Sequence, residues 1–294
     1  MRRTIYLLSC TALLLSLLTS CNKVNNTSSV EGKGWKDENL KGQVKSYTEH
    51  KYSATEKFGE TEKENLESAT QLLFNEVGDQ IEFISYKSDG SVGDKIKKNY
   101  DDHGNLTTDW LYDSDGKLKL KVIYKYDDTG SLIESYWYKP EGKLEEKIKF
   151  QYEENERIKE EYSYNSEGEL VYKWIRRYDE NGNLTEVSSY NSEGKLENKR
   201  IRRYDENGNL TEESSYNSEG KLENKWIKQY DEKGSLIEEC MYDSEGKLEY
   251  KSKFEYQYDE RGNWTQCLSV TTYHTSIGSF DAIELAEREY EYYE

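Results

Sequence analysis

Tyr178–Glu186 reads Tyr-Asp-Glu-Asn-Gly-Asn-Leu-Thr-Glu, and the same nine residues return at Tyr204–Glu212. Looser copies run from Phe74 to Trp264, each with an aromatic residue, a glycine four positions later and an apolar residue soon after it. The aspartate can accept a hydrogen bond within the turn, and the glycine can adopt the left-handed backbone conformation. The stretch therefore predicts a tight turn that closes a β-hairpin.

The turn glycines recur at steps that alternate between 12 and 14 residues, so a full period is 26 residues and holds two strand–turn units. A fixed period of this length indicates a repeat architecture. The turn positions are Gly78, Gly90, Gly104, Gly116, Gly130, Gly142, Glu156 in place of a glycine, Gly168, Gly182, Gly194, Gly208, Gly220, Gly234, Gly246 and, after a step of 16, Gly262.

The strands between these turns alternate apolar and polar residues, which is typical of an antiparallel sheet with one solvated face. In Lys143–Tyr152 the even positions are Leu144, Glu146, Ile148, Phe150 and Tyr152. Because every step between turns is even, we expect the even positions of all strands to share one face. Trp110, Trp174 and Trp226 would then join that face, since each lies six residues after its turn glycine.

Fifteen turns imply about sixteen strands, a sheet roughly 70 Å wide at about 4.8 Å per strand. Residues 177–202 and 203–228 differ only at Val187/Glu213, Arg200/Trp226 and Arg202/Lys228. A dry core would not accept the second exchange, because an unpaired buried arginine costs several kcal/mol. We therefore expect an all-β, elongated antiparallel β-meander of 26-residue repeats, in an open or spiralling sheet whose middle is wet on both faces. Residues 263–294 would form a terminal cap.

The first residues form a targeting segment rather than part of the fold. Arg2 and Arg3 precede an apolar run from Ile5 to Leu18, which is too short to span a bilayer and suits a signal peptide. Leu18-Thr19-Ser20-Cys21 resembles the lipobox of bacterial lipoproteins, which implies removal of residues 1–20 and lipid attachment at Cys21. A plain secretory signal is the alternative. Residues 21–41 would be a flexible tether and residues 42–294 a single β-repeat domain, with the array at about 74–266.

The amino-acid composition limits the kinds of partner that the protein can bind. The chain has 34% hydrophobic and 34% charged residues, but also 27 Tyr and a single Pro, which favours a thin β-structure over disorder. The net charge of -18 disfavours nucleic acid and anionic lipid surfaces as partners. By resemblance to sorted lipoproteins, Asn22 favours the outer membrane within the cell envelope. Cys240 and Cys267 would lie on opposite faces, two strands apart, and so remain free thiols.

The Tyr-Asp-Glu-Asn-Gly-Asn-Leu frame resembles the YD (RHS-type) repeats of bacterial surface and toxin-shell proteins. Tyr190–Leu196, which reads Tyr-Asn-Ser-Glu-Gly-Lys-Leu, resembles the MORN-like repeat of bacterial antitoxin-type proteins. Together the resemblances cover about residues 74–266. They imply a hairpin-built, all-β, extracytoplasmic protein, although this chain lacks the size and the appended toxin domain of the large shells.

No residue pattern indicates catalysis or a cofactor. The acidic turns lack the carboxylate spacing of a calcium loop, and His50, His103 and His274 are scattered. We therefore expect no metal site and no enzyme activity. Among the possible functions, an enzyme ranks third. We expect first a structural or binding module for protein or glycan, and as the alternative a toxin-neutralising or immunity-type lipoprotein. The candidate binding face comprises Trp110, Trp174, Trp226, Tyr124, Tyr136 and Tyr162, since aromatic rows can stack sugars or grip protein.

Overall fold

The computed structural model describes residues 33–58, 60–153 and 157–294, which form one short helix and eighteen strands. The elements are α2 (Lys33–Asp37), β1 (Val44–Lys57), β2 (Glu60–Phe74), β3 (Gln80–Tyr86), β4 (Val92–Tyr100), β5 (Leu106–Tyr112), β6 (Leu118–Tyr126), β7 (Leu132–Tyr138), β8 (Leu144–Tyr152), β9 (Ile158–Asn165), β10 (Leu170–Tyr178), β11 (Leu184–Asn191), β12 (Leu196–Tyr204), β13 (Leu210–Asn217), β14 (Leu222–Tyr230), β15 (Leu236–Asp243), β16 (Leu248–Tyr258), β17 (Trp264–Thr275) and β18 (Gly278–Tyr292). The predicted signal peptide and Cys21 lie outside the described residues.

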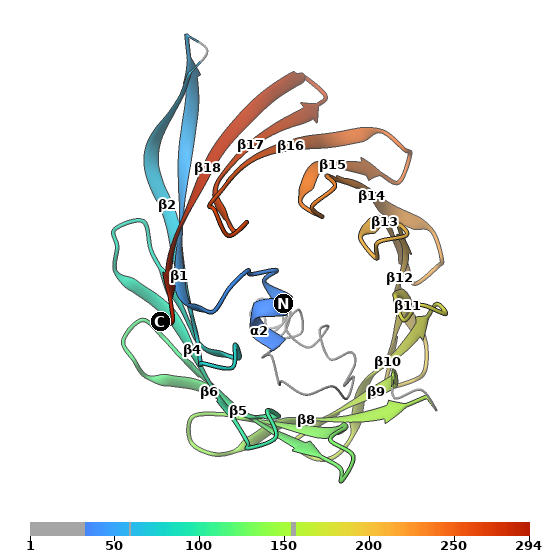
Figure 1. Cartoon of the computed structure of the whole chain (residues 1–294). Helices are drawn as coiled ribbons and strands as arrows, with labels where there is room; N and C mark the ends of the chain where they lie inside the picture. The colour runs from blue at the N-terminus through green and yellow to red at the C-terminus, as the bar shows by residue number, and fades with distance from the viewer. Residues whose placement is uncertain (1–32, 59, 154–156) are drawn as a thin grey trace.

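Each strand pairs antiparallel with the next in the sequence, and β1 pairs with β18, so the meander closes into an 18-stranded barrel (Figure 1). The all-β antiparallel class is thus confirmed, but the open or spiralling sheet is wrong. Closure pairs the backbone groups that two free edges would have left open. It also corrects the role of residues 263–294, because β17 and β18 complete the wall and are not a cap.

The turns are built as their residues predict. In Asp205–Leu210, the carboxylate of Asp205 accepts hydrogen bonds from the backbone N–H groups of Asn207 and Asn209, and Gly208 has a φ of 86°. The fourteen turn glycines predicted from the repeat all have φ between 75° and 94°, which only glycine adopts readily. The predicted turn at Glu156 lies outside the described residues.

Each of these repeat turns also carries a one-residue β-bulge that the spacing conceals. Arg203 pairs with Glu212, but the next ladder pair is Tyr204 with Leu210, so one residue is extra on one side. An extra residue reverses which positions face which side of the sheet. The expectation that even positions share one face is therefore wrong. Even positions on even-numbered strands lie on the same face of the sheet as odd positions on odd-numbered strands.

The interior of the ring is identified by the N-terminal segment. Figure 1 shows α2 inside the barrel, and its Trp35 packs against Tyr47, Leu72 and Phe74. Trp35 is held there by hydrogen bonds from its indole N–H to the carbonyl of Val44 and from its backbone N–H to the carbonyl of Gly78. Residues 33–41 are thus part of the folded unit, whereas the sequence assigned them to the flexible tether.

The tyrosine that begins each repeat motif ties successive hairpins together. Tyr204 donates its hydroxyl hydrogen to the carbonyl of Leu184, twenty residues earlier, and Tyr230 does the same to Leu210. Equivalent bonds join Tyr100 to Gln80, Tyr126 to Leu106 and Tyr152 to Leu132. This end of the barrel, at which α2 also lies, is called the tyrosine end below.

Candidate functional site: the lumen wall of β10–β18

The bulges divide the six residues of the predicted binding face between two surfaces. Trp174, Trp226 and Tyr124 face the lumen, because they share the face on which Tyr47 and Leu72 meet α2. Trp110, Tyr136 and Tyr162 lie on even positions of odd-numbered strands and face outward. The six residues therefore do not form one surface, and the predicted binding face must be corrected.

The outward-facing tyrosines contact charged side chains that recur at each period. Tyr162 bonds to the carboxylate of Glu160, and the ammonium of Lys173 lies 5.1 Å from the centre of its ring. Glu160 and Lys173 belong to a row of outer ion pairs that repeats at each period and includes Glu134–Lys147 one period earlier, with N–O distances of 2.6–3.1 Å. The further members are Glu186–Lys199, Glu212–Lys225 and Glu238–Lys251. Such a wall is a solvated exterior, in which Tyr136 and Tyr162 cover backbone and lysine stems.

The lumen wall of β4–β9 is apolar and closely packed. Its core comprises Ile96, Leu111, Val122, Tyr124, Leu132, Trp137, Ile148, Phe150 and Ile158, each less than 9% exposed. Tyr124 donates a hydrogen bond to the buried carboxylate of Asp109, which also lies 3.7 Å from the ammonium of Lys98. Tyr124 is thus a core residue whose polar end is satisfied, and it offers no binding surface.

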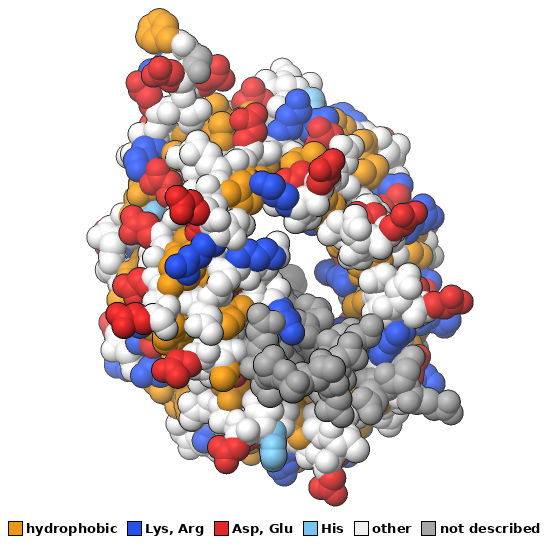
Figure 2. Space-filling view, in the orientation of Figure 1, with side chains coloured by type: hydrophobic (Ala, Val, Ile, Leu, Met, Phe, Trp, Pro, Cys, Tyr) orange, Lys and Arg blue, Asp and Glu red, His pale blue; other side chains and the backbone are white. Residues whose placement is uncertain are grey.

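The lumen wall of β10–β18 differs, because it carries an open row of aromatic side chains. The rings form two groups, a pair on β10 and a set of four on β14, β16, β17 and β18. Within each group the centres of neighbouring rings are 5.2–5.8 Å apart. We call the following set the aromatic row: Tyr172 and Trp174 on β10, Trp226 on β14, Tyr250 on β16, Tyr273 on β17 and Phe280 on β18. Tyr172, Tyr273 and Phe280 are 36%, 38% and 58% exposed, so the row is not a closed core. Figure 2 shows the molecule hollowed at its centre.

Polar groups occupy the gaps in this row. Asn198 and Asn224 face the lumen on β12 and β14, where they are paired in register with Ser189 and Ser215. Ser189 Oγ and Arg176 Nε are buried and have no hydrogen-bond partner among the described residues. A buried donor without a partner costs about 1–3 kcal/mol, so ordered solvent is expected at these two groups, as at Asp109 Oδ1 of the opposite wall.

Ion pairs brace the same wall between neighbouring strands. Arg176 pairs with Glu161 at 2.5 Å, Arg202 with Glu213 at 2.6 Å and Lys228 with Glu239 at 2.9 Å. Burial raises the pKa of the Glu161 carboxyl, and the guanidinium of Arg176 opposes the shift. Burial and then the nearby charge of Glu239 raise the pKa of the Tyr250 hydroxyl, which keeps it a neutral donor.

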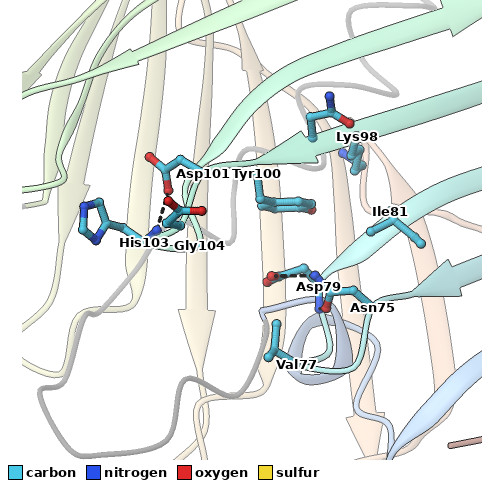
Figure 3. A pocket seen from close by; sticks show the side chains of 11 residues that line it. Asn75, Val77, Asp79, Ile81, Lys98, Tyr100, Asp101, His103 and Gly104 are labelled. Carbon is cyan, nitrogen blue, oxygen red and sulfur yellow. Dashed lines mark hydrogen bonds between the residues drawn. The ribbon is translucent and has the colours of Figure 1, made fainter.

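A separate cavity of about 560 Å³ opens at the tyrosine end, between the β2–β3 and β4–β5 turns (Figure 3). Its polar groups already serve the turns, since Asp79 accepts from Asn75 and Asp101 accepts from the backbone of His103. Tyr100, which separates the two turns, donates to the carbonyl of Gln80. The cavity is therefore shaped by turn chemistry and presents no converging reactive groups.

The described residues contain no group of three or more His, Cys, Asp or Glu side chains that could hold a metal ion. His274 Nδ1 lies 2.9 Å from Ser279 Oγ, but the two are exposed neighbours across β17 and β18. The nearby carboxylate of Asp281 accepts from Thr272 instead of orienting the imidazole. This contact is a cross-strand pair without the third group of a hydrolytic triad. Cys240 and Cys267 are free thiols.

Sequence reasoning missed Tyr172, Tyr250, Tyr273 and Phe280 as members of the lumen row. Tyr172 and Tyr250 already lay on the face that the sequence predicted, at even positions. The signal that could have placed Tyr273 with them is the aspartate–glycine turn itself, since three-residue hairpin loops with a left-handed glycine commonly carry a bulge. Allowing for one extra residue at each turn would have put Trp110 on the opposite face from Trp174. Among the described residues, no helix has the length and apolar character needed to cross a bilayer.

No protein-family model matches the chain, and no curated protein sequence matches it. Among solved structures it is similar to a porin-like protein from Bacteroides uniformis, with 12% identity, a TM-score of 0.45 and coverage of 84% of this chain and 96% of that one. A porin-like protein from Bacteroides vulgatus has 11% identity, a TM-score of 0.37 and coverage of 85% and 98%. A putative outer membrane lipoprotein-sorting protein domain from Vibrio parahaemolyticus has 12% identity, a TM-score of 0.27 and coverage of 84% and 85%. With TM-scores below 0.5, these likenesses carry no argument about ligand or location.

Proposed function

We propose that this protein is a lipid-anchored, extracytoplasmic lipoprotein of the cell envelope that binds a glycan in the lumen of its barrel. The aromatic row carries the proposal. Its rings are partly exposed on a concave wall, and they alternate with the amides of Asn198 and Asn224. Sugars present a C–H face that stacks on aromatic rings and hydroxyl groups that pair with such amides.

The length of the row favours an extended ligand. Trp174 on β10 and Trp226 on β14 are four strand spacings apart, roughly 19 Å along the wall. Tyr250, Tyr273 and Phe280 continue the row across β16, β17 and β18. A chain of several sugars could therefore contact separate rings at once, which raises affinity without any single strong contact.

The anchor belongs to the same proposal. Cleavage before Cys21 and lipid attachment there would hold the barrel at a membrane, since two or more acyl chains bind firmly. Mass spectrometry of the full chain expressed in a bacterium should show loss of residues 1–20 and a lipid-modified Cys21. Replacement Cys21→Ser should release the protein into the soluble fraction, and unchanged membrane fractionation of this variant would contradict the anchor.

The binding proposal is tested on the mature, detergent-solubilised protein with an array of purified glycans, followed by titration calorimetry on the best hexasaccharide. Trp174→Ala and Trp226→Ala should each weaken binding about tenfold, the equivalent of losing about 1.4 kcal/mol of contact. Trp110→Ala is the matched control, because this tryptophan faces outward on β5. Equal effects of all three changes would contradict a site in the lumen. Capture of a protein with no glycan bound would favour the toxin-neutralising alternative.

A further inference from the structure

The lumen wall of β10–β18, called the polar wall below, carries cations that are paired with glutamates, with one exception among the described residues. Arg176, Arg202 and Lys228 each have a glutamate on a neighbouring strand within 2.9 Å. Arg200 also faces the lumen, but it has no carboxylate within ion-pair distance among the described residues. It is an exposed guanidinium in a protein whose net charge is -18.

The register shows why this arginine has no partner. Arg200 stands opposite Val187 on β11 and Ser215 on β13. The positions one period before and after Val187 are Glu161 and Glu213, so a glutamate would have faced Arg200 if the repeat had been kept. Two of the three differences between the neighbouring repeats thus meet in the lumen: one places an arginine there, and the other places a valine where a glutamate would have stood opposite it.

Arg200 lies where its charge could contact a ligand in the lumen. Residues 174, 200 and 226 occupy the same position of successive repeats, so Arg200 lies between Trp174 and Trp226 in the gap of the aromatic row. A guanidinium offers several N–H donors in a plane and binds carboxylate or sulfate oxygens through paired hydrogen bonds. Trp174 and Trp226, which flank Arg200 along the row, are the rings on which adjoining sugars would stack.

We infer that the glycan bound in the lumen is acidic, and that Arg200 binds a carboxylate or sulfate group on one of its sugars. This inference rests on the proposed function and names its substrate class. Because hydrogen bonds to charged groups are stronger than those between neutral groups, an acidic chain should bind about 10- to 100-fold more tightly than a neutral one. The preference should weaken as the salt concentration rises, because Arg200 is exposed and its charge is screened.

The test compares three hexasaccharides on the mature, detergent-solubilised protein by titration calorimetry: a neutral glucan, a hexagalacturonate and a sulfated galactan. The wild type should bind an acidic chain at least tenfold more tightly than the neutral chain. Tight binding of the hexagalacturonate alone would name a carboxylate, and tight binding of the galactan alone a sulfate. Equal affinity for all three chains would overturn the inference while leaving glycan binding intact, whereas no binding of any chain would overturn the proposed function itself.

Two variants separate the charge of Arg200 from its stacking neighbours. Arg200→Trp introduces the residue that the next repeat has at this position, so it should fold, and it should lose the acidic preference while still binding the neutral chain. Val187→Glu places a carboxylate opposite Arg200 in the register, keeps Arg200 in place and should lower only the affinity for acidic chains. An acidic preference that survives both changes, with unaltered melting temperatures, would contradict the role of Arg200.

Discussion

The two halves of the lumen wall use the same repeat for opposite purposes. At one position of successive repeats, β4, β6 and β8 carry Ile96, Val122 and Ile148, whereas β10, β12 and β14 carry Trp174, Arg200 and Trp226. The three aliphatic side chains are at most 3% exposed, while Arg200 is open to the lumen. The turns, bulges and tyrosine bonds are alike in both halves. The backbone framework therefore holds the barrel, and the lumen positions are free to provide either a core or a binding wall.

The largest expected effect appears when one tryptophan from each half is changed to alanine. Trp137 lies in the apolar wall and is 3% exposed, so Trp137→Ala leaves a cavity and should lower the free energy of unfolding by about 3–5 kcal/mol. Trp174→Ala should cost about 1 kcal/mol or less, since this ring is already partly exposed. Urea unfolding followed by circular dichroism measures both values. Equal losses would show that the polar wall is as much a core as the apolar wall.

The second contrast concerns ion pairs of the same kind. Asp109 and Lys98 have side chains only 4% and 5% exposed, so Asp109→Asn leaves a buried lysine without its counter-charge and should cost about 3 kcal/mol. Glu239→Gln, in the more exposed pair with Lys228 of the polar wall, should cost about 1 kcal/mol. The measurement is again urea unfolding, at pH 7. A larger loss for Glu239→Gln than for Asp109→Asn would reverse the ranking of the two walls.

The third effect is smaller and appears as a dependence on pH. Burial raises the pKa of the Glu146 carboxyl in the apolar wall, with a hydrogen bond from Ser163 opposing it. A raised pKa in the folded state means that stability declines as the pH rises from the unfolded value of about 4.3 through the folded one. Glu146→Gln removes this decline, so the stability of the variant relative to the wild type should increase with pH across that window.

The outer wall provides the control for this pH effect. A hydrogen bond from Tyr162, opposed by partial burial and aided by Lys173, lowers the pKa of Glu160. Its contribution is present above the unfolded pKa and is lost as the pH falls through the folded one. Glu160→Gln should therefore lose its difference from the wild type in acid, the opposite trend to Glu146→Gln. Thermal melting from pH 3 to 7 distinguishes the two, and parallel trends would contradict the assignment of faces.

Much of the fold could be predicted from local chemistry. Asp205 and Gly208 show how: the carboxylate binds turn N–H groups and the glycine takes a left-handed conformation, and both preferences act within a few residues. The bulge beside Tyr204 could not be counted from the spacing, because it changes the pairing without changing the length of the repeat. That single omission placed Trp110, Tyr136 and Tyr162 on the wrong face.

The candidate site was predicted only in part for the same reason. Trp174 and Trp226 were identified, and the Arg200/Trp226 exchange correctly indicated a wet surface, since Arg200 is exposed in the structure. Tyr273 and Phe280 were missed because their meeting depends on the β17–β18 pairing outside the regular array. The missing counter-ion of Arg200 likewise became visible only from the cross-strand register with Val187.

The strands of the repeat array, the positions of its turns and the antiparallel order could be predicted, because each depends on residues close together in the chain. Closure of the sheet through β1 and β18 could not be predicted in this way, since the pairing joins residues more than 200 positions apart. Closure in turn defined an inside and an outside. It placed a charged, solvated row on one surface, and the aromatic row with Arg200 on the other.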